Sequence, residues 1–344
     1  MIIGAQASPD GLSLAILDDN RRVLARSRFD SSLAWDINTN VDAAAAEIVS
    51  AVKTCCSALS SGVEAREDPW LSISILCVGT TALDHGGAEA EAAFRSALQK
   101  LLPPGLQLMV YHSAAVALAS GTGGPLVGCV LLVGQDTSRA YGAVADRRTA
   151  SSSGWGPVFS DGGCAYALAS LRLGPILLLV VLLVVLVNAD VGMRALAAVS
   201  RAQDGRGADT LLVSAVWARG HSSIHSRVAG VASLAPVVLE CAARGDTVAD
   251  ALLRHAVGEL LRAVKSVAGR LGLDKSRLPF NLVLAGPMLS EGSLFMQYLL
   301  DVLKDGVPTA DVIYPQGDGA EAAAWLALWL LNPQLPLPPV RRGL

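Results

Sequence analysis

Residues 2–17 read IIGAQASPDGLSLAIL and decide the fold class. Two apolar runs, Ile2–Ala5 and Leu12–Leu17, stand on either side of a turn-forming stretch. The residues Asp-Asp-Asn at 18–20 then lead into a third apolar run, Val23–Ala25. Short apolar runs separated by turn residues are typical of strands that pair antiparallel. The sequence therefore predicts a sheet that begins as an antiparallel meander.

Downstream of the meander, helical and strand patterns alternate. An alanine-rich helical segment is followed by strand, helix and strand, and a strand pair then starts the order again. Two copies of one unit predict an α/β protein with two lobes and a cleft between them. The expected segments are the helices Val41–Cys56 and Ala88–Leu101 and the strands Ile73–Val78, Leu106–Tyr111, Cys129–Val133, Tyr141–Ala145 and Asn281–Ala285.

The expected lobes span residues 1–121 and 122–318, with the glycine-rich link Ser120–Gly124 as the hinge. In this prediction the C-terminal helix, 319–332, packs back on the first lobe, and the proline-rich tail 333–344 is frayed. Apolar residues at three- and four-residue spacing predict that the second half is mostly helical, with helices at Val191–Gln203, Asp209–Ala218, Val228–Ala243 and Thr247–Leu271.

The composition is that of a globular protein. Of the 344 residues, 52% are hydrophobic and 17% are charged, so the chain can bury a large core. The formal net charge is -3, and the clusters of Lys and Arg that nucleic acid or an anionic membrane surface requires are missing from the sequence. Six scattered cysteines form no CxxC pair, and the first residues lack the pattern of a targeting segment. Both features indicate the reducing cytoplasm.

Three turns of the sequence are placed to hold phosphate groups. They lie at Gln6–Asp10, at Gly134–Thr137, and after the strand that ends at Ala285, where Gly286 opens a turn toward a helix. Phosphoryl transfer needs backbone N–H groups at tight glycine turns, a carboxylate for Mg²⁺ and a base for the acceptor hydroxyl. The turns therefore favour a phosphotransferase.

A series of motifs resembles one protein family in order and spacing. The motifs are Val116–Gly123 with Gly128–Leu131, Ala140–Gly142, Gly154–Ala169, Arg201–Gly207 and Ile313–Pro315. They resemble the N-acetylglucosamine kinase family in its plant and algal form, with a BadF/BadG/BcrA/BcrD-type ATPase domain. The resemblance implies a two-lobed actin-like ATPase (ribonuclease H-like) fold, each lobe a mixed sheet flanked by helices. It also implies ATP and Mg²⁺ as cofactors, and N-acetylglucosamine or a related amino sugar as the acceptor of phosphate at its 6-hydroxyl; a homodimer is left open.

The catalytic position departs from the family pattern. In the family, an Asn-Asp pair follows the strand before the hinge helix, and its Asp is the general base; here the pair reads His112-Ser113. A serine does not take a proton at neutral pH, whereas a histidine, with a pKa of about 6.5, does. Alternatively, Ser113 is only the N-cap of the helix. The resemblance adds Asp161 to the reacting centre.

The phosphate loops also depart from the pattern. In the first loop, Gln-Ala-Ser-Pro replaces an Asp with glycines and threonines, and Asp10 stands two residues out of register with the lost acid. In the second loop, Gly134 and Thr137 remain as donors to phosphate. In the third, Gly286 remains but a proline follows it, and the expected helix start reads Ala-Ala-Ala at 322–324. No residue is assigned as a metal ligand.

The predicted sugar loop keeps more of the pattern. Its glycine-rich turn is Gly154–Gly156, and Asp161 is expected to bind sugar hydroxyls or water on Mg²⁺. Trp155 either closes over the sugar ring or packs in the core. The resemblance adds Gln135. It also implies an Asn near the end of the third strand, which aligns with Ser31 or Ser32, and the downstream Asn40 is an alternative.

An apolar stretch interrupts the family pattern. Residues 173–189 carry no charge, and about 17 residues is the lower limit for a membrane-spanning helix. Gly174-Pro175 and the lack of an adjacent basic cluster argue against a span. Relative to the family, residues 167–189 are inserted, and we interpret them as retained intron or gene-model sequence.

Two other functions are alternatives to an active kinase. One is a catalytically inactive homologue that retains sugar or nucleotide binding, since several catalytic positions are substituted. The other is an acyl-CoA dehydratase activator of the same ATPase type, which is disfavoured because the sequence has no paired cysteines for an iron-sulfur cluster.

Overall fold

The computed structural model describes residues 1–8, 11–30, 37–59, 69–84, 88–134, 137–153, 164, 211, 235–275 and 278–342. The chain divides into two compact units. Unit 1 contains Met1–Val130, Ala143–Arg147 and Val312–Leu344, and unit 2 contains Leu131–Gly142 and Arg148–Asp311. The lobe boundary predicted at 121/122 stays a prediction.

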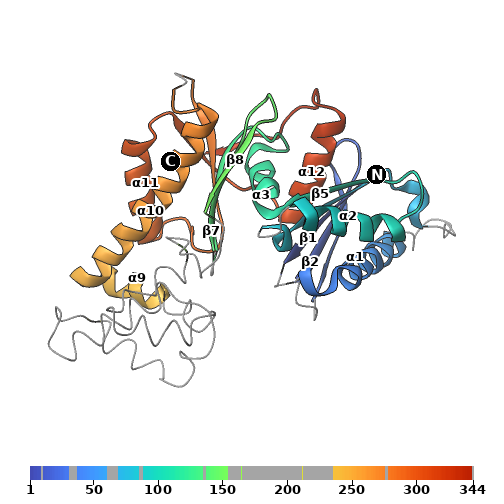
Figure 1. Ribbon diagram of the computed structural model, residues 1–344, viewed down its shortest axis with the longest axis horizontal. Helices are drawn as coiled ribbons and strands as arrows, with labels where there is room; N and C mark the ends of the chain where they lie inside the picture. Colours follow the sequence, from blue (N-terminus) through green and yellow to red (C-terminus); the bar gives the residue numbers. More distant parts are fainter. Residues whose placement is uncertain are drawn as a thin grey trace. The chain divides into compact units, whose positions relative to one another are not determined.

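Unit 1 is built on a five-stranded sheet of order β3-β2-β1-β4-β5. The first three strands pair antiparallel, which confirms the predicted meander, while β1, β4 and β5 run parallel. Apolar side chains on both faces of the parallel strands are expected, because helices cover both faces of such a sheet. The strands are β1 (Ile2–Ser8), β2 (Gly11–Leu17), β3 (Val23–Phe29), β4 (Ile75–Thr80) and β5 (Gln107–His112) (Figure 1).

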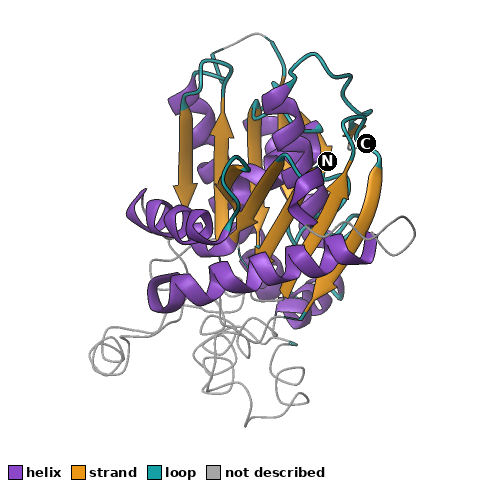
Figure 2. Cartoon of the chain, turned by 90° about the vertical axis from the view of Figure 1, so that its right-hand side faces the viewer, coloured by secondary structure: helices purple, strands orange, loops and turns teal. Residues whose placement is uncertain are grey.

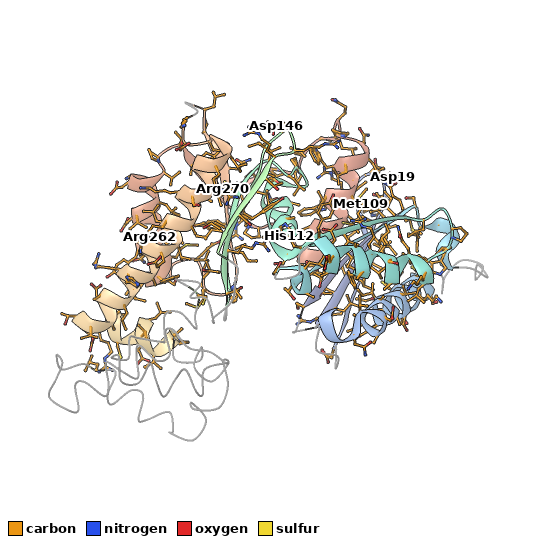
Figure 3. The ribbon with its side chains drawn as sticks, in the orientation of Figure 1. Asp19, Met109, His112, Asp146, Arg262 and Arg270 are labelled. Atoms are coloured by element: carbon orange, nitrogen blue, oxygen red, sulfur yellow. The ribbon has the colours of Figure 1, made fainter. Side chains whose placement is uncertain are left out.

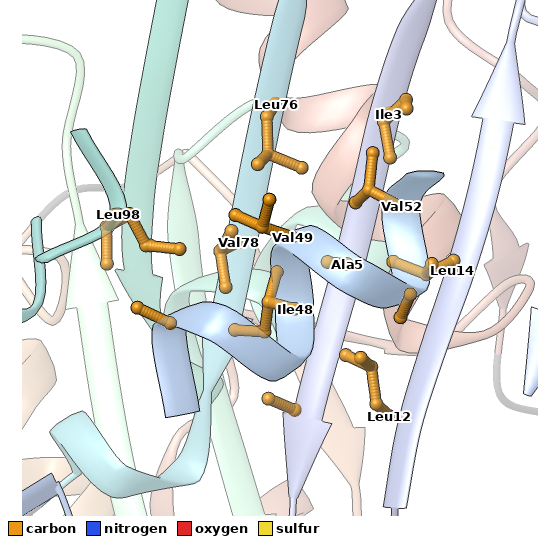
Figure 4. Packing of buried hydrophobic residues seen from close by; sticks show 14 of the residues in the cluster. Ile3, Ala5, Leu12, Leu14, Ile48, Val49, Val52, Leu76, Val78 and Leu98 are labelled. Carbon is orange, nitrogen blue, oxygen red and sulfur yellow. The ribbon is translucent and has the colours of Figure 1, made fainter. Parts of the chain in front are cut away.

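Helices pack on the two faces of this sheet (Figure 2). Since successive side chains of a strand point to opposite faces, Ile3 and Ala5 join one core and Ile2 joins the other. The first core includes Ile48 and Leu98 (Figure 4). The helices of unit 1 are α1 (Ile37–Leu59), α2 (Ala88–Leu101), α3 (Ser113–Thr122) and α12 (Gly319–Leu331), with 3-10 turns η2 (Pro69–Ser72) and η3 (Thr81–Leu83).

Helix α12 joins the second core of unit 1, although it comes from the end of the chain. Its backbone touches β1 at Gly4, where a Cβ atom would lie 1.8 Å from the carbonyl oxygen of Ala320 and 2.6 Å from the nitrogen of Ala324. Only glycine allows this approach. Side chains Ala320, Ala323 and Ala324 are fully buried, so the alanine-rich composition of the helix follows from its close packing.

The second sheet has the order β11-β10-β9-β6-β7-β8. Its longest neighbouring helix, α10, begins and ends where the sequence predicts, because Asp246 caps its first turn and Gly272 adopts the left-handed conformation at its end. The strands are β6 (Gly128–Val133), β7 (Ser138–Ala143), β8 (Thr149–Ser153), β9 (Phe280–Ala285), β10 (Ala310–Tyr314) and β11 (Arg341–Arg342), and the helices are α9 (Ala235–Ala243), α10 (Thr247–Leu271) and α11 (Leu294–Gly306).

Several predictions are refined or corrected. The first three residues of the link Ser120–Gly124 form the buried last turn of α3 and Gly123 ends that helix, and its role as a hinge stays a prediction. The tail expected to be frayed contains β11, which pairs antiparallel with β10. Strand β7 begins three residues before the predicted strand at Tyr141. By contrast, helix α12 begins at Gly319, the first residue of the predicted C-terminal helix 319–332.

Some predictions lie outside the described residues. They are the helices at 191–203 and 209–218, apart from the isolated residue 211, and the apolar stretch 167–189. Within the described ranges, no helix is both long and apolar enough to cross a membrane.

Candidate active site

The carboxyl ends of three parallel strands lie together at one edge of the first sheet. Ala7 on β1 is in register with Thr80 on β4, and Thr80 is in register with His112 on β5. Ligands of α/β proteins bind at this edge of a parallel sheet, because the loops that follow the strands converge there. The residues after β4 and β5 are therefore the first candidates for a functional site in unit 1.

Gln6 occupies the position where the resemblance predicts an aspartate. Its side chain packs against two glycines: a Cβ atom on Gly79 would lie 2.6 Å from Gln6 Oε1, and one on Gly319 would lie 2.8 Å from Gln6 Cγ. Gly319 is the first residue of α12, so the Gln6 amide lies beside a helix N-terminus. An uncharged amide in this place cannot act as the carboxylate that Mg²⁺ prefers.

His112 is the N-cap of α3, and Ser113 is the first residue of that helix. The alternative that placed the N-cap at Ser113 is therefore wrong by one residue. The Nδ1 atom of His112 accepts a hydrogen bond from the backbone N–H of Ala115, with 3.2 Å between the nitrogens (Figure 3 labels His112). Because this bond uses the Nδ1 lone pair, a neutral His112 carries its proton on Nε2. The nitrogen that accepts a proton is therefore already engaged with the helix.

Asp84 is a site residue that the sequence analysis missed. Its Oδ1 accepts a hydrogen bond from the backbone N–H of Ser113 at 3.0 Å, and its Oδ2 accepts one from the Ser113 hydroxyl. The half-buried carboxylate thus lies at the strand edge, against the position where the family pattern has its catalytic Asp. A signal was present in the sequence, since Asp84 closely follows the fully buried strand β4.

Local structure after β4 determines where Asp84 lies. The Thr80 hydroxyl accepts a hydrogen bond from the N–H of Ala82 at 3.2 Å and so caps the turn η3. The N–H of Asp84 closes the turn by donating to the carbonyl of Thr81 at 3.0 Å. This single turn places the carboxylate beside the residue that follows β5.

Tyr111 is the last residue of β5 before His112, and it is paired in register with Gly79. Burial is the main cause that raises the pKa of its phenol. Tyr111 therefore stays protonated over the neutral range, and its side chain packs against the second core of unit 1.

In unit 2 the structure brings two predicted phosphate-binding positions together. Gly286 follows β9 with a φ of +112°, and a Cβ atom on it would lie 2.2 Å from the carbonyl oxygen of Val133, the last residue of β6. Gly134 comes next, and its N–H donates to the carbonyl of Thr137 at 2.8 Å, which closes the turn between β6 and β7. Two positions without side chains at neighbouring strand ends suit the approach of a phosphate to the backbone.

The Asn40 side chain caps a kink in the first turns of α1. Its backbone is non-helical, with φ of -155° and ψ of 64°, and its Oδ1 accepts a hydrogen bond from the N–H of Ala43 at 3.2 Å. The side chain thus caps the following part of the helix. Its role as a sugar ligand stays a prediction.

The remaining predicted site residues lie outside the described part of the chain. They are Asp10, Gln135, Gly154, Trp155, Gly156 and Asp161. Their roles stay predictions. Among the described residues, no group of three or more His, Cys, Asp or Glu side chains forms a metal site.

No family model matches the sequence. Two characterised relatives do. The chain is 24% identical to the N-acetyl-D-glucosamine kinase of Dictyostelium discoideum over 342 residues, which cover 95% of this chain and 98% of that protein. It is 25% identical to the N-acetylmuramic acid/N-acetylglucosamine kinase of Clostridium acetobutylicum over 265 residues, covering 74% and 77% of the two chains.

Solved structures show the same fold. A protein assigned as an N-acetylglucosamine kinase from Chromobacterium violaceum matches with a TM-score of 0.66 and 20% identity, over 94% of this chain and 98% of that one. The ROK hexokinase of Thermus thermophilus matches with a TM-score of 0.50 and 14% identity, over 96% and 98%. These likenesses confirm the predicted two-lobed α/β fold of the sugar-kinase and actin type.

Proposed function

Because the chain belongs to the N-acetylglucosamine kinase family, we propose that it is an amino-sugar kinase that transfers the γ-phosphate of ATP to the 6-hydroxyl of N-acetylglucosamine. The observation that carries the proposal is the match to the D. discoideum kinase over 98% of its length. A match of that extent includes both lobes rather than a shared nucleotide-binding half.

The arrangement of the described residues supports this proposal. In unit 1, a carboxylate and a histidine lie at the carboxyl ends of parallel strands, where an acceptor hydroxyl needs a base. In unit 2, Gly286 would allow a phosphate of ATP to approach the backbone, and the Thr137 hydroxyl would donate to it at the turn that the N–H of Gly134 closes. Mg²⁺ would neutralise phosphate charge when bound, and it commonly takes only one or two protein carboxylates.

We also propose the setting of the reaction. The acceptor is N-acetylglucosamine or a related amino sugar, as the names of the two relatives suggest. The compartment is the cytoplasm, which is supported by six cysteines that are all buried as free thiols. Nucleic acid is not a proposed partner, in keeping with the net charge of -3.

The test is release of ADP by the purified chain with Mg²⁺-ATP, in the presence and absence of N-acetylglucosamine. The matched control is 6-deoxy-N-acetylglucosamine, which lacks only the proposed acceptor hydroxyl. We expect ADP release with the first sugar alone. ADP release that is equal with both sugars, or that no amino sugar stimulates, would reject the proposed function in favour of an inactive homologue or another acceptor.

A further inference from the structure

We propose that Asp84 is the carboxylate that binds the acceptor hydroxyl and takes its proton, with Ser113 as the residue that positions it. This inference rests on the proposed function and names the base that the substituted His112-Ser113 pair does not provide. It comes from the two hydrogen bonds that join Asp84 to Ser113.

The geometry puts the charge of Asp84 where the family pattern needs it. Both hydrogen bonds go to the residue that replaces the family's aspartate, so the Asp84 carboxylate is within hydrogen-bonding reach of the Ser113 side chain. The parallel register of β4 and β5 creates this contact, because it aligns Thr80 with His112 and the turn η3 carries the chain back toward Ser113. A carboxylate therefore lies after the end of β4, beside the strand end where the family pattern has one.

The two neighbouring residues are poorer bases. The Nδ1 atom of His112 accepts the hydrogen bond of Ala115, and using it as a base would cost the cap of α3. The Ser113 hydroxyl donates to Asp84, and a serine does not hold a proton from a sugar at neutral pH. A carboxylate offers about four acceptor positions, more than the two hydrogen bonds from Ser113 require.

The proposed phosphoryl transfer conserves atoms and electrons. The O–H bond of the sugar hydroxyl breaks and its proton passes to Asp84, while the oxygen forms a bond to the γ-phosphorus of ATP. The bond between that phosphorus and the β–γ bridging oxygen breaks, and its electron pair leaves with ADP. Release of the proton to water returns Asp84 to its ionised form.

An alternative explanation of the same contact is that Asp84 only stabilises the start of α3. A carboxylate at the start of a helix stabilises its free N–H groups, and Asp84 does this for α3 through the N–H of Ser113. Asp18 serves as the matched control, because its Oδ1 likewise accepts backbone N–H groups, from Asn20 and Arg22, at 2.9 and 2.8 Å. It follows Leu17, which is paired with Ile2, so it lies at the opposite edge of the same sheet.

The experiment compares the wild type with Asp84→Asn, Asp18→Asn and the exchange variant Asp84→Ser/Ser113→Asp. For each, turnover with N-acetylglucosamine and ATP, the dissociation constant of the sugar by calorimetry, and the thermal unfolding midpoint are measured. We expect Asp84→Asn to lower kcat by about 100-fold or more, the usual contribution of a general base, with the KM for ATP unchanged. The exchange variant should recover at least about 10-fold of that loss, because it restores a carboxylate on the partner position, and Asp18→Asn should keep wild-type turnover.

The outcomes separate this inference from the proposed function. Full turnover by Asp84→Asn overturns the role of Asp84 and leaves the kinase activity standing. Equal loss in Asp84→Asn and the exchange variant, with both folded, also overturns it, because a carboxylate restored on the other side of the same contact then supports no proton transfer. If the wild type shows no sugar-dependent turnover, the proposed function and the proton transfer both fail. In that case calorimetry tests whether Asp84 binds the sugar hydroxyl. Weaker sugar binding by Asp84→Asn than by the wild type supports this contact. Equal binding by the two proteins, or no detectable binding by either, overturns it.

Discussion

Gly286 lies directly against Val133, so that a Cβ atom at position 286 would be 2.2 Å from the Val133 carbonyl oxygen and 2.8 Å from its nitrogen. The φ of Gly286, +112°, is also one that side chains with a Cβ atom rarely adopt. The missing side chain and the positive φ of Gly286 together allow the end of β9 to lie against the end of β6, next to Gly134. The proposed phosphate-binding turns therefore depend on the absence of a side chain at one position.

Gly286→Ala is expected to destabilise unit 2 strongly. The forced backbone conformation costs about 1–2 kcal/mol, and the clash with Val133 adds about 1–3 kcal/mol. Gly292→Ala is the matched control, because Gly292 has a φ of +78° but no atom within 4 Å of its Cβ position. Urea unfolding should show the smaller loss for Gly292→Ala, and equal losses would mean that the contact with Val133 is not as close as described.

An ion pair between an exposed and a buried side chain links the last helix to the first sheet. Glu321 of α12 is paired with Arg26 of β3, and their side chains are 6% and 60% exposed. Arg26→Ala should destabilise the protein by about 1–2 kcal/mol, because it leaves a buried carboxylate without its partner while water replaces part of the exposed guanidinium. The change is measured by urea unfolding, with the exposed Arg22→Ala as the control.

A double-mutant cycle separates pairing from side-chain packing. If the cost comes from the unpaired charge, Arg26→Ala should cost much less in a Glu321→Gln background. Additive losses would show that Arg26 stabilises the sheet through its aliphatic chain alone.

The buried thiol of Cys77 is expected to lower the stability of the folded protein at alkaline pH. Burial raises the pKa of its thiol from 9.0 to about 12. Above pH 9 the unfolded chain loses this proton while the folded chain keeps it, so the free energy of unfolding falls as the pH rises toward 12. Below pH 9 both states are protonated and the thiol contributes no pH dependence.

The comparison is urea unfolding of the wild type and Cys77→Ala at about pH 8 and about pH 10.5. The variant should lose less stability between the two conditions. Part of the decline should remain, because burial also raises the pKa of Cys56 and of Cys129 to about 12. An identical decline in both proteins would contradict the assignment to Cys77.

Local patterns in the sequence were enough to predict much of the fold. The meander was predictable because apolar runs alternate with turn residues, and α10 because an amphipathic segment lies between a capping Asp246 and Gly272. Helix α11 and strand β11 were missed. The pairing of β11 with β10 depends on residues almost thirty positions apart, which no local pattern records.

The candidate site was less predictable for the same reason. Gly134 and Gly286 stood out because a glycine directly after an apolar run marks a turn at a strand end, and the structure places both beside Val133. Asp84 was missed because its contact with Ser113, 29 residues away, arises only from the parallel register of β4 and β5. His112 was correctly singled out as a residue at the strand end, but its hydrogen bond to Ala115 could not be read from the sequence.

The most direct test of the central claim is phosphorus NMR of the wild-type chain with Mg²⁺-ATP and N-acetylglucosamine. We expect the ATP signals to be replaced by those of ADP and of a phosphomonoester coupled to the protons on carbon 6 of the sugar. Unchanged ATP, or conversion to ADP and inorganic phosphate without a sugar phosphate, would contradict it.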